Sequence, residues 1–306
     1  QNNNPTRDNY QNYLQNTHRV EELWHFSHVD SDEVLKIIND LKPKSSCGID
    51  NISSKTLNKL KHIISQPIAN IINQSIDLCI FPNQLKTTKV KALFKKGAKS
   101  NPSNYRPISL LPSISKIFEK VLHKQLTDFL NSNNILYNNQ YGFRKQHSTE
   151  HAALELVDRL TKIMDSNKTP FAVFIDLSKA FDCLNHNVLL HKLSHYGIKA
   201  SALQLLNSYL SNRKQYIACD NLNSSTVSIS TGVPQGSIMG PLLFLIYMND
   251  FNMATNNFHM INYADDTTLI STLSANCENI DQINSELTKI SLWLKANKLT
   301  INVNKS

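Results

Sequence analysis

The sequence has no apolar stretch as long as a membrane span, no CxxC pair, and no signal peptide at its start, QNNNPTRDNY. These absences argue against a membrane protein, a disulfide framework and a cysteine-based zinc site. There is no internal repeat, and no low-complexity tract beyond the Asn-rich start. The cysteines are odd in number and scattered, which fits a reducing intracellular compartment; they are Cys47, Cys79, Cys183, Cys219 and Cys277.

The chain does contain enough apolar material for a sizeable core. It has 306 residues, of which 41% are hydrophobic, and this length suits two subdomains around a shared core. The formal net charge of +8 favours a polyanionic partner, although many basic globular proteins bind nothing anionic. The start lacks an initiator Met and the end, INVNKS, stops just after a strand-like run, so we expect a fragment of a longer protein.

Helical and strand-like patterns alternate after a polar lead-in over residues 1–30. Asp30 and Glu33 form a capping-box-like start, and apolar residues at helical spacing follow until Pro43. Further helices are expected around 63–76, where Pro67 would kink or split the helix, and over 113–131, 149–166, 187–196, 201–211, 238–250 and 278–296. Strands are expected at VKALF, FAVFI, QYIA, TVSIS, FHMIN and TTLIS. This pattern predicts an α+β fold in which helices cover one face of a sheet.

Three aspartates stand at the ends of predicted strands. FAVFI ends abruptly at Asp176, and FHMIN and TTLIS flank the adjacent pair Asp265 and Asp266. If these strands are neighbours in one sheet, the carboxylates lie together, and like charges so placed need a cation. Magnesium prefers oxygen ligands, and two such ions about 4 Å apart can activate a hydroxyl and stabilise a leaving pyrophosphate. The alternative is that Asp265 and Asp266 only form a polar hairpin turn.

Six motifs carry a resemblance to a known family. FAVFIDLSKAFDCLNH, GVPQGSIMGPLLFLIYMNDF and NYADDTTLI resemble the successive palm motifs of reverse transcriptases from non-LTR (LINE-type) retrotransposons, closest to jockey-like elements. YRPISLLPSISKIFEKVLHKQL and NQYGFRKQHSTEHA resemble the fingers motifs, and WLKANKLTINVNKS resembles the segment after the catalytic hairpin. The resemblance covers most of residues 30–306, with the motifs in family order.

The resemblance implies the fingers and palm of a right-hand polymerase, with the palm a small antiparallel sheet backed by helices. Residues 31–168 would form the fingers with an N-terminal helical extension, and residues 169–306 a palm that is cut off before the thumb. The family also implies an upstream endonuclease domain in the intact protein. It implies a location in a cytoplasmic ribonucleoprotein and in the nucleus.

For the catalytic centre, the resemblance implies that Asp176, Asp265 and Asp266 bind two Mg²⁺ ions, with Mn²⁺ as a possible substitute. The Leu177 carbonyl would be a further metal ligand, and Tyr263 would lie near the primer end. Asp182 shares the first motif but is displaced from the strand end, which favours a structural role.

Several residues would contact the nucleotide. Phe181 would lie under the incoming sugar and exclude a ribose 2′-OH; the alternative is a core phenylalanine. Gln235 and Gly236 would line the dNTP and template pocket, where glycine permits close approach of the backbone. Arg106 would grip the triphosphate, because its planar fork suits phosphate oxygens. Lys95 and Lys96 could assist, although a solvated lysine pair is the default.

Other basic residues would contact the nucleic acid or the leaving group. Arg144 and Lys145 would bind template or nucleotide phosphates, and Lys305 would donate a proton to pyrophosphate. His191 and His195 have a spacing that could chelate zinc, but no HExxH motif or nearby cysteine supports such a site.

The predicted activity is RNA-templated DNA synthesis, with an RNA template, a DNA primer or target, and dNTPs as partners. One alternative is an RNA-templated RNA polymerase, against which Phe181 and the YADD form argue. The other is a domesticated or decayed element that binds nucleic acid without catalysis, against which the intact carboxylates argue.

Overall fold

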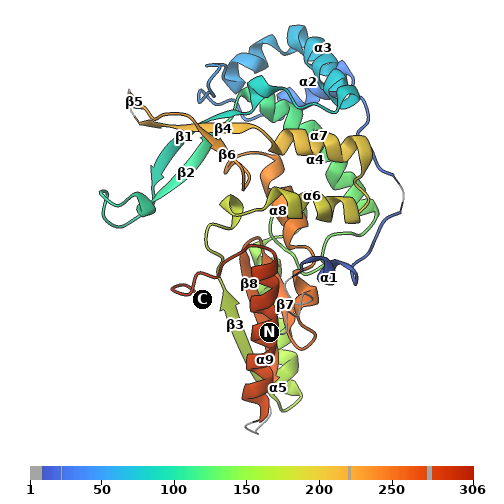
Figure 1. Cartoon of the computed structure of the whole chain (residues 1–306), viewed down its shortest axis with the longest axis vertical. Helices are drawn as coiled ribbons and strands as arrows, with labels where there is room; N and C mark the ends of the chain where they lie inside the picture. Colours follow the sequence, from blue (N-terminus) through green and yellow to red (C-terminus); the bar gives the residue numbers. More distant parts are fainter. Residues whose placement is uncertain (1–8, 22, 220–221, 274–277) are drawn as a thin grey trace, which may run out of the picture. The chain divides into compact units, whose positions relative to one another are not determined.

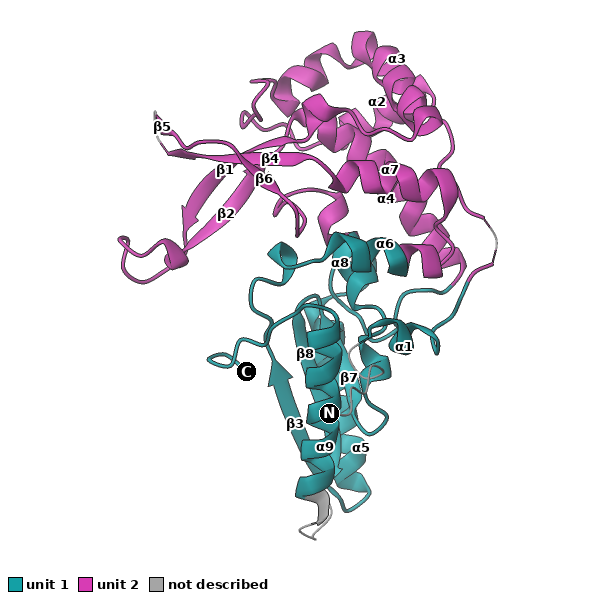
Figure 2. Cartoon of the chain, viewed as in Figure 1, with its two compact units in different colours: residues 1–19, 134–192, 243–306 teal, residues 20–133, 193–242 magenta. Residues whose placement is uncertain are grey.

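The computed structural model describes residues 9–21, 23–219, 222–273 and 278–306; the first eight residues of the lead-in and Cys277 lie outside this part. The chain divides into two compact units, shown in different colours in Figure 2. Unit 1 comprises residues 1–19, 134–192 and 243–306, and unit 2 comprises residues 20–133 and 193–242. Each unit is therefore assembled from segments that are distant in the sequence.

Helices make up much of both units (Figure 1). Helix α2 begins after Asp30, whose side chain accepts a hydrogen bond from the Glu33 amide, as the capping-box pattern predicts. Ser53 and Ser148 cap α3 and α5 in the same way. The helices are α1 (Gln11–Leu14), α2 (Ser31–Asn39), α3 (Ser54–Leu78), α4 (Ser113–Ser132), α5 (Thr149–Asp165), α6 (His186–His195), α7 (Ala200–Leu210), α8 (Met239–Met248) and α9 (Glu278–Ala296), with 3₁₀ turns η1 (Asn83–Leu85), η2 (Pro102–Asn104), η3 (Ala180–Asp182) and η4 (Phe251–Ala254).

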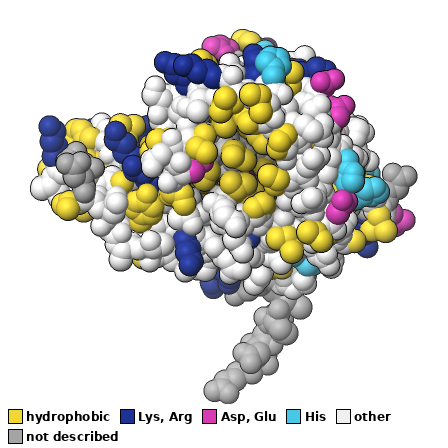
Figure 3. All heavy atoms as spheres, turned by 90° about the horizontal axis from the view of Figure 1, so that it is seen from above, with side chains coloured by type: hydrophobic (Ala, Val, Ile, Leu, Met, Phe, Trp, Pro, Cys, Tyr) yellow, Lys and Arg dark blue, Asp and Glu magenta, His cyan; other side chains and the backbone are white. Residues whose placement is uncertain are grey.

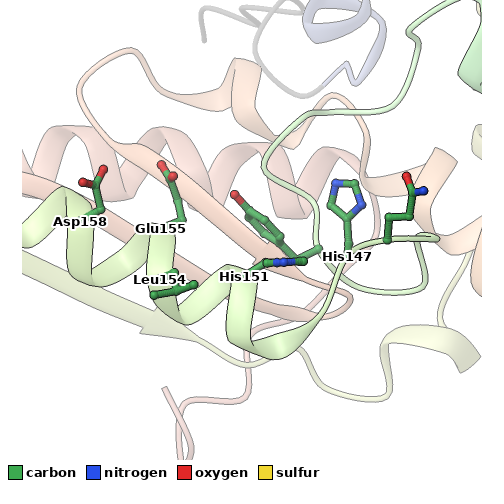
Figure 4. Close-up of a pocket in the computed structure, with 7 residues that line it drawn as sticks. His147, His151, Leu154, Glu155 and Asp158 are labelled. Carbon is green, nitrogen blue, oxygen red and sulfur yellow. The ribbon is translucent and has the colours of Figure 1, made fainter.

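Unit 1 is built on a three-stranded antiparallel sheet in the order β3-β8-β7. Its strands are β3 (Thr169–Ile175), β7 (His259–Tyr263) and β8 (Asp266–Leu273). Helices α5 and α9 lie on opposite faces of this sheet (Figures 1 and 4). The consecutive residues Leu269 and Ile270 are both buried, and because neighbouring side chains point to opposite faces, both faces of β8 are covered.

Unit 2 contains a five-stranded mixed sheet. The strand order is β2-β1-β4-β5, and β6 also pairs with β4. Strand β1 pairs antiparallel with β2 and parallel with β4. The strands are β1 (Thr87–Phe94), β2 (Tyr105–Leu110), β4 (Arg213–Cys219), β5 (Leu222–Asn223) and β6 (Val227–Ile229). The molecule is thus a mixed α/β protein with sheets that are mostly antiparallel.

Three expectations from the sequence were wrong, and a fourth was wrong in part. Of the two outcomes expected at Pro67, a kink or a split of the helix, the split does not occur, because α3 is continuous. The helices cover both faces of the unit 1 sheet rather than one. The run INVN forms an isolated bridge between Leu177 and Ile301 and no strand. The predicted loop KKGAKSNPSNYRP enters strand β2, where Pro107 is tolerated because β2 lies at the edge of its sheet.

Part of the polar lead-in packs into unit 2. Phe26 is buried, and the Trp24 ring stacks on Phe129 at a centroid distance of 5.0 Å. Trp24 also meets Phe26 edge-on at 4.7 Å. These aromatic contacts fasten the segment before α2 to helix α4.

Helix α3 carries a second apolar face besides the one in the core. Its side chains at Leu60, Ile63, Ile71 and Leu78 are exposed, with Ile63 at 75%. Figure 3 shows hydrophobic side chains gathered in a patch on the surface of the molecule. No helix among the described residues is long and apolar enough to cross a membrane.

Unit 1 also holds a fully buried ion pair. The Lys192 ammonium lies 2.5 Å from an Asp250 carboxylate oxygen, and both side chains are 0% exposed. The other carboxylate oxygen accepts a hydrogen bond of 3.2 Å from the Trp293 indole. Lys192 also donates to the Tyr247 carbonyl at 2.6 Å and lies over the Trp293 ring. This cluster joins α6, α8 and α9.

Candidate active site

The three aspartates come together at one end of the unit 1 sheet. In the β3–β8 register Ile175 faces Thr267, so Asp176, the next residue, is brought beside Asp266. Tyr263 pairs with Asp266 and leaves Ala264 and Asp265 as the two turn residues of the β7–β8 hairpin. The sequence prediction that these strands are neighbours is confirmed.

A lysine side chain is paired with one of these carboxylates. The Lys305 ammonium lies 2.7 Å from an Asp176 carboxylate oxygen, and this bond is the main reason why the pKa of Lys305 is raised. Burial, followed by the charges of Asp266 and Asp176, raises the pKa of Asp265. Within the described ranges, no group of three or more His, Cys, Asp or Glu side chains is arranged to hold a metal ion.

The donor set nevertheless suits a divalent ion. All three side chains offer hard carboxylate oxygens, which Mg²⁺ prefers. The negative charges of Asp266 and Asp176 add to the effect of burial in raising the pKa of Asp265. A positive charge nearby would therefore stabilise the ionised carboxylates. The Lys305 ammonium stands in for such a charge. The residues present therefore fit divalent metal ions.

The segment after α9 lies against the end of β3. Leu177 is buried and forms an antiparallel bridge with Ile301. The Ser178 amide donates to the Thr300 carbonyl, and the Asn302 amide donates to the Asp176 carbonyl, both at 2.8 Å. These bonds place Lys305 beside the three carboxylates.

Phe181 lies on η3, a few residues beyond Asp176. Its ring stacks on Phe244 at 4.6 Å and meets Phe143 edge-on at 5.9 Å. Phe181 is half-buried, whereas Phe143 is 55% exposed. The stack on Phe244 holds the Phe181 ring in place and leaves part of it accessible.

The other predicted nucleotide contacts lie in unit 2. The Gln235 carbonyl accepts a hydrogen bond of 2.8 Å from the Ser109 amide, which ties the GVPQGS turn to strand β2. Gly236 has a φ of +119°, and a Cβ there would lie 2.9 Å from the Ser109 carbonyl oxygen. Only glycine fits this backbone without strain. Arg106 is exposed on the same strand.

Register places Arg106 on a basic face of the unit 2 sheet. Arg106 pairs with Leu93 of β1, so their side chains lie on the same side of the sheet. Alternate residues of one strand share a face, so Lys91 and Lys89 lie on this side too. Thr87 pairs with Lys214, which adds a further cation to this side. We call Lys89, Lys91, Arg106 and Lys214 the basic face.

Glu119, which the sequence analysis did not single out, binds the backbone directly after the GVPQGS turn. It is 0% exposed, and its carboxylate accepts hydrogen bonds from the amides of Ile238 at 2.6 Å and Met239 at 3.4 Å. Burial raises the pKa of this carboxyl. A lone glutamate on a helix gives no sequence signal for this role.

We expect Glu119→Leu to lower the free energy of unfolding at neutral pH by about 1–3 kcal/mol, because two buried amides lose their acceptor. Because the pKa of this carboxyl is raised in the folded protein, the carboxyl makes its full contribution to stability at pH values below its ordinary pKa. This contribution is lost as the pH rises through the raised pKa of the folded protein. Glu119→Gln keeps an acceptor but does not titrate. Urea unfolding across pH 4–8 should therefore show a decline for wild type relative to Glu119→Gln, and parallel curves would contradict the assignment.

The remaining predicted residues lie on or near the hairpin. Tyr263 is exposed beside the turn. Arg144 donates to the Tyr137 carbonyl at 2.8 Å, so part of its guanidinium is engaged in the fold. Lys145 is exposed. His191 accepts or donates a bond of 3.3 Å with Gln11, which fits an ordinary surface histidine.

A groove of about 410 Å³ is lined by residues of α5 and of the segment before it (Figure 4). His147, His151, Glu155 and Asp158 line it, and Glu155 is bonded to His259 at 2.8 Å.

A known protein family matches most of the chain. Residues 94–306 match the family described as Reverse transcriptase (RNA-dependent DNA polymerase). The chain belongs to the reverse transcriptase family. This match includes all of the predicted catalytic and nucleotide-contacting residues.

Relatives of this reverse transcriptase domain come from insect transposable elements. The chain is 33% identical over 292 residues to the probable RNA-directed DNA polymerase from transposon BS of Drosophila melanogaster. It is 30% identical over 281 residues to the one from transposon X-element of the same species, and 27% identical over 285 residues to the RNA-directed DNA polymerase from mobile element jockey of Drosophila funebris. Each comparison covers 90% of this chain but only 31% of the relative's length.

Proposed function

We propose that this reverse transcriptase domain copies an RNA template into DNA by transferring nucleotides from dNTPs to a primer 3′-OH. The observation that carries the proposal is the register of β3, β7 and β8, which brings Asp176 to the Asp265–Asp266 turn. A sheet of this kind within a reverse transcriptase domain is a site for metal-assisted phosphoryl transfer.

Asp176, Asp265 and Asp266, with the Leu177 carbonyl, would hold two Mg²⁺ ions, which Mn²⁺ could replace. When bound, the ions supply activation of the primer hydroxyl and stabilisation of the pyrophosphate. Lys305 is positioned by Asp176 and would protonate the leaving group, which requires it to move from that carboxylate. Tyr263 would contact the primer end beside the turn.

The nucleotide would be selected by its sugar and gripped by its phosphates. The Phe181 ring, held by Phe244, would clash with a ribose 2′-OH. Arg106 would contact the triphosphate bidentately, and Gln235 and Gly236 would line the pocket. Arg144 and Lys145 would contact template phosphates. Residues 31–168 would correspond to fingers and 169–306 to a palm, with an endonuclease upstream in the intact protein.

Primer extension tests this function directly. Wild-type chain with a primed RNA template and Mg²⁺ should incorporate dNTPs in preference to rNTPs, and Phe181→Ala should reduce that preference. Preferential incorporation of rNTPs by wild type would favour an RNA-templated RNA polymerase instead. Template binding with no extension in any divalent metal would favour a decayed element that only binds nucleic acid.

The basic face makes a separate prediction about the nucleic-acid partner. Replacing Lys89, Lys91 and Lys214 by glutamine should remove about three phosphate contacts and reduce the slope of log affinity against log salt by about 2 for single-stranded RNA. Fluorescence anisotropy of a labelled RNA at several salt concentrations measures this slope.

The matched control replaces three exposed lysines of α2 and α3, Lys36, Lys55 and Lys59, by glutamine. This control makes the same change of net charge in the same unit but should leave the slope within about 0.5 of wild type. Equal slopes for the two triple variants would show that RNA binding depends on the net charge of the protein and not on the basic face.

A further inference from the structure

A short segment before α5 lies along the catalytic hairpin. Gln140 forms a parallel bridge with Asn262 of β7. The Asn262 amide donates to the Asn139 carbonyl at 2.9 Å, and the Tyr141 amide donates to the Asn262 carbonyl at 2.7 Å. Residues 139–142 therefore extend the sheet on the β7 side and reach the turn that carries Asp265.

The side chain of Gln140 binds this turn directly. Gln140 is only 4% exposed, and its Oε1 accepts hydrogen bonds from the Ala264 amide at 2.9 Å and from the Gly142 amide at 2.8 Å. Both partners are N–H donors, which fixes the orientation of the carboxamide. Ala264 is the residue directly before Asp265.

The turn needs such support because its backbone is unfavourable for its sequence. Ala264 has a φ of +57°, at a position where a two-residue hairpin turn ordinarily favours glycine. The backbone of Gly142 packs against it so closely that a Cβ on Gly142 would lie 2.3 Å from the Ala264 nitrogen. A strained conformation of this kind persists only where its surroundings hold it.

We infer that Gln140 is a positioning residue of the polymerase site: its buried carboxamide fixes the Ala264 peptide and thereby aims Asp265 and Asp266 for metal binding. This inference rests on the proposed function. The carboxamide supplies the acceptor that the turn requires. Gln140 acts through the backbone of the turn and does not itself touch substrate or metal.

The test uses Gln140→Leu, which keeps the size of the side chain but removes the acceptor, and Gln140→Glu, which keeps an acceptor. Asn249→Leu is the matched control. Asn249 is also a buried amide of unit 1, and it bonds the Tyr137 amide and the Ile135 carbonyl at the start of the same segment without touching the turn. Purely structural effects should therefore appear equally in Gln140→Leu and Asn249→Leu.

Two readouts on folded protein are measured without catalysis. Hydrogen exchange at the Ala264 amide should be slow in wild type and Gln140→Glu and at least tenfold faster in Gln140→Leu, because that amide loses its acceptor. Mn²⁺ affinity, followed by the electron paramagnetic resonance of free Mn²⁺, should fall at least tenfold in Gln140→Leu. It should remain within threefold of wild type in Gln140→Glu and Asn249→Leu.

Each other result decides against the inference. If Gln140→Leu is folded and binds Mn²⁺ as tightly as wild type, the positioning role is overturned while the proposed function stands. If Asn249→Leu loses as much affinity as Gln140→Leu, the effect is structural and the role is likewise overturned. If wild type binds Mn²⁺ no better than Asp265→Ala, the proposed function fails and the positioning role fails with it.

Discussion

Asp176→Asn should lower the rate of primer extension on an RNA template by on the order of 10³-fold or more, because a metal-binding carboxylate supports several kcal/mol of transition-state stabilisation. The amide keeps the size of the side chain but loses the negative charge that we propose binds a divalent ion. It also loses the ionic partner of Lys305, which lies 2.7 Å away in wild type. RNA affinity should be unchanged, so single-turnover extension at saturating template measures the effect on chemistry alone.

Asp182→Asn is the matched control for this prediction. It makes the same substitution in the same motif, on η3 and away from the strand end that carries Asp176. We expect its extension rate to stay within about tenfold of wild type, since the loss would be structural and not catalytic. A comparable loss in both variants, or a fully active Asp176→Asn, would remove the basis for assigning Asp176 to the catalytic centre.

Asp250→Ala should destabilise the protein by about 3–5 kcal/mol, because it leaves the Lys192 ammonium buried without its counter-ion. Burial lowers the pKa of Lys192 and Asp250 opposes this effect, so removal of the carboxylate favours the neutral amine. The variant also deprives the Trp293 indole of its acceptor. Urea unfolding followed by tryptophan fluorescence would measure the loss.

An exposed ion pair provides the comparison for the buried one. Asp158 pairs with Lys162 one turn along α5, and both side chains are more than half exposed. Asp158→Ala should cost no more than about 0.5 kcal/mol. A double variant with Lys192→Met and Asp250→Leu should be more stable than Asp250→Ala, because it buries no unpaired charge. If Asp250→Ala unfolds like wild type, the pair does not stabilise unit 1.

Local patterns were sufficient to predict most elements of the fold. The continuous apolar run FAVFI predicted strand β3 and its end at Asp176. The runs on either side of the two aspartates predicted β7 and β8. The spacing of apolar residues over 278–296 matches α9. These elements are set by the chain's own periodicity, so their positions follow from sequence.

Contacts between distant segments were not predictable in the same way. Nothing in the alternation of TTLIS shows that both Leu269 and Ile270 are buried by helices on opposite faces. The parallel pairing of β1 with β4 depends on a connection of more than 100 residues. Gln140 and Glu119 were missed because a single polar residue carries no periodic signal; only the three-dimensional structure shows which amides it binds.

The discontinuous construction of unit 1 has a consequence for biosynthesis. Asp176 and Asp265 are separated by about 90 residues, which takes roughly 5–18 s to synthesise at the usual rate of elongation. The Val20–Asn133 part of unit 2 is synthesised before Asp176, Asp265 and Asp266. The bridge between Leu177 and Ile301 closes later still. A nascent chain would thus remain unable to assemble its three carboxylates until β8 (Asp266–Leu273) has been translated, and termination before that point would leave β3 without its partner strand and exposed to aggregation.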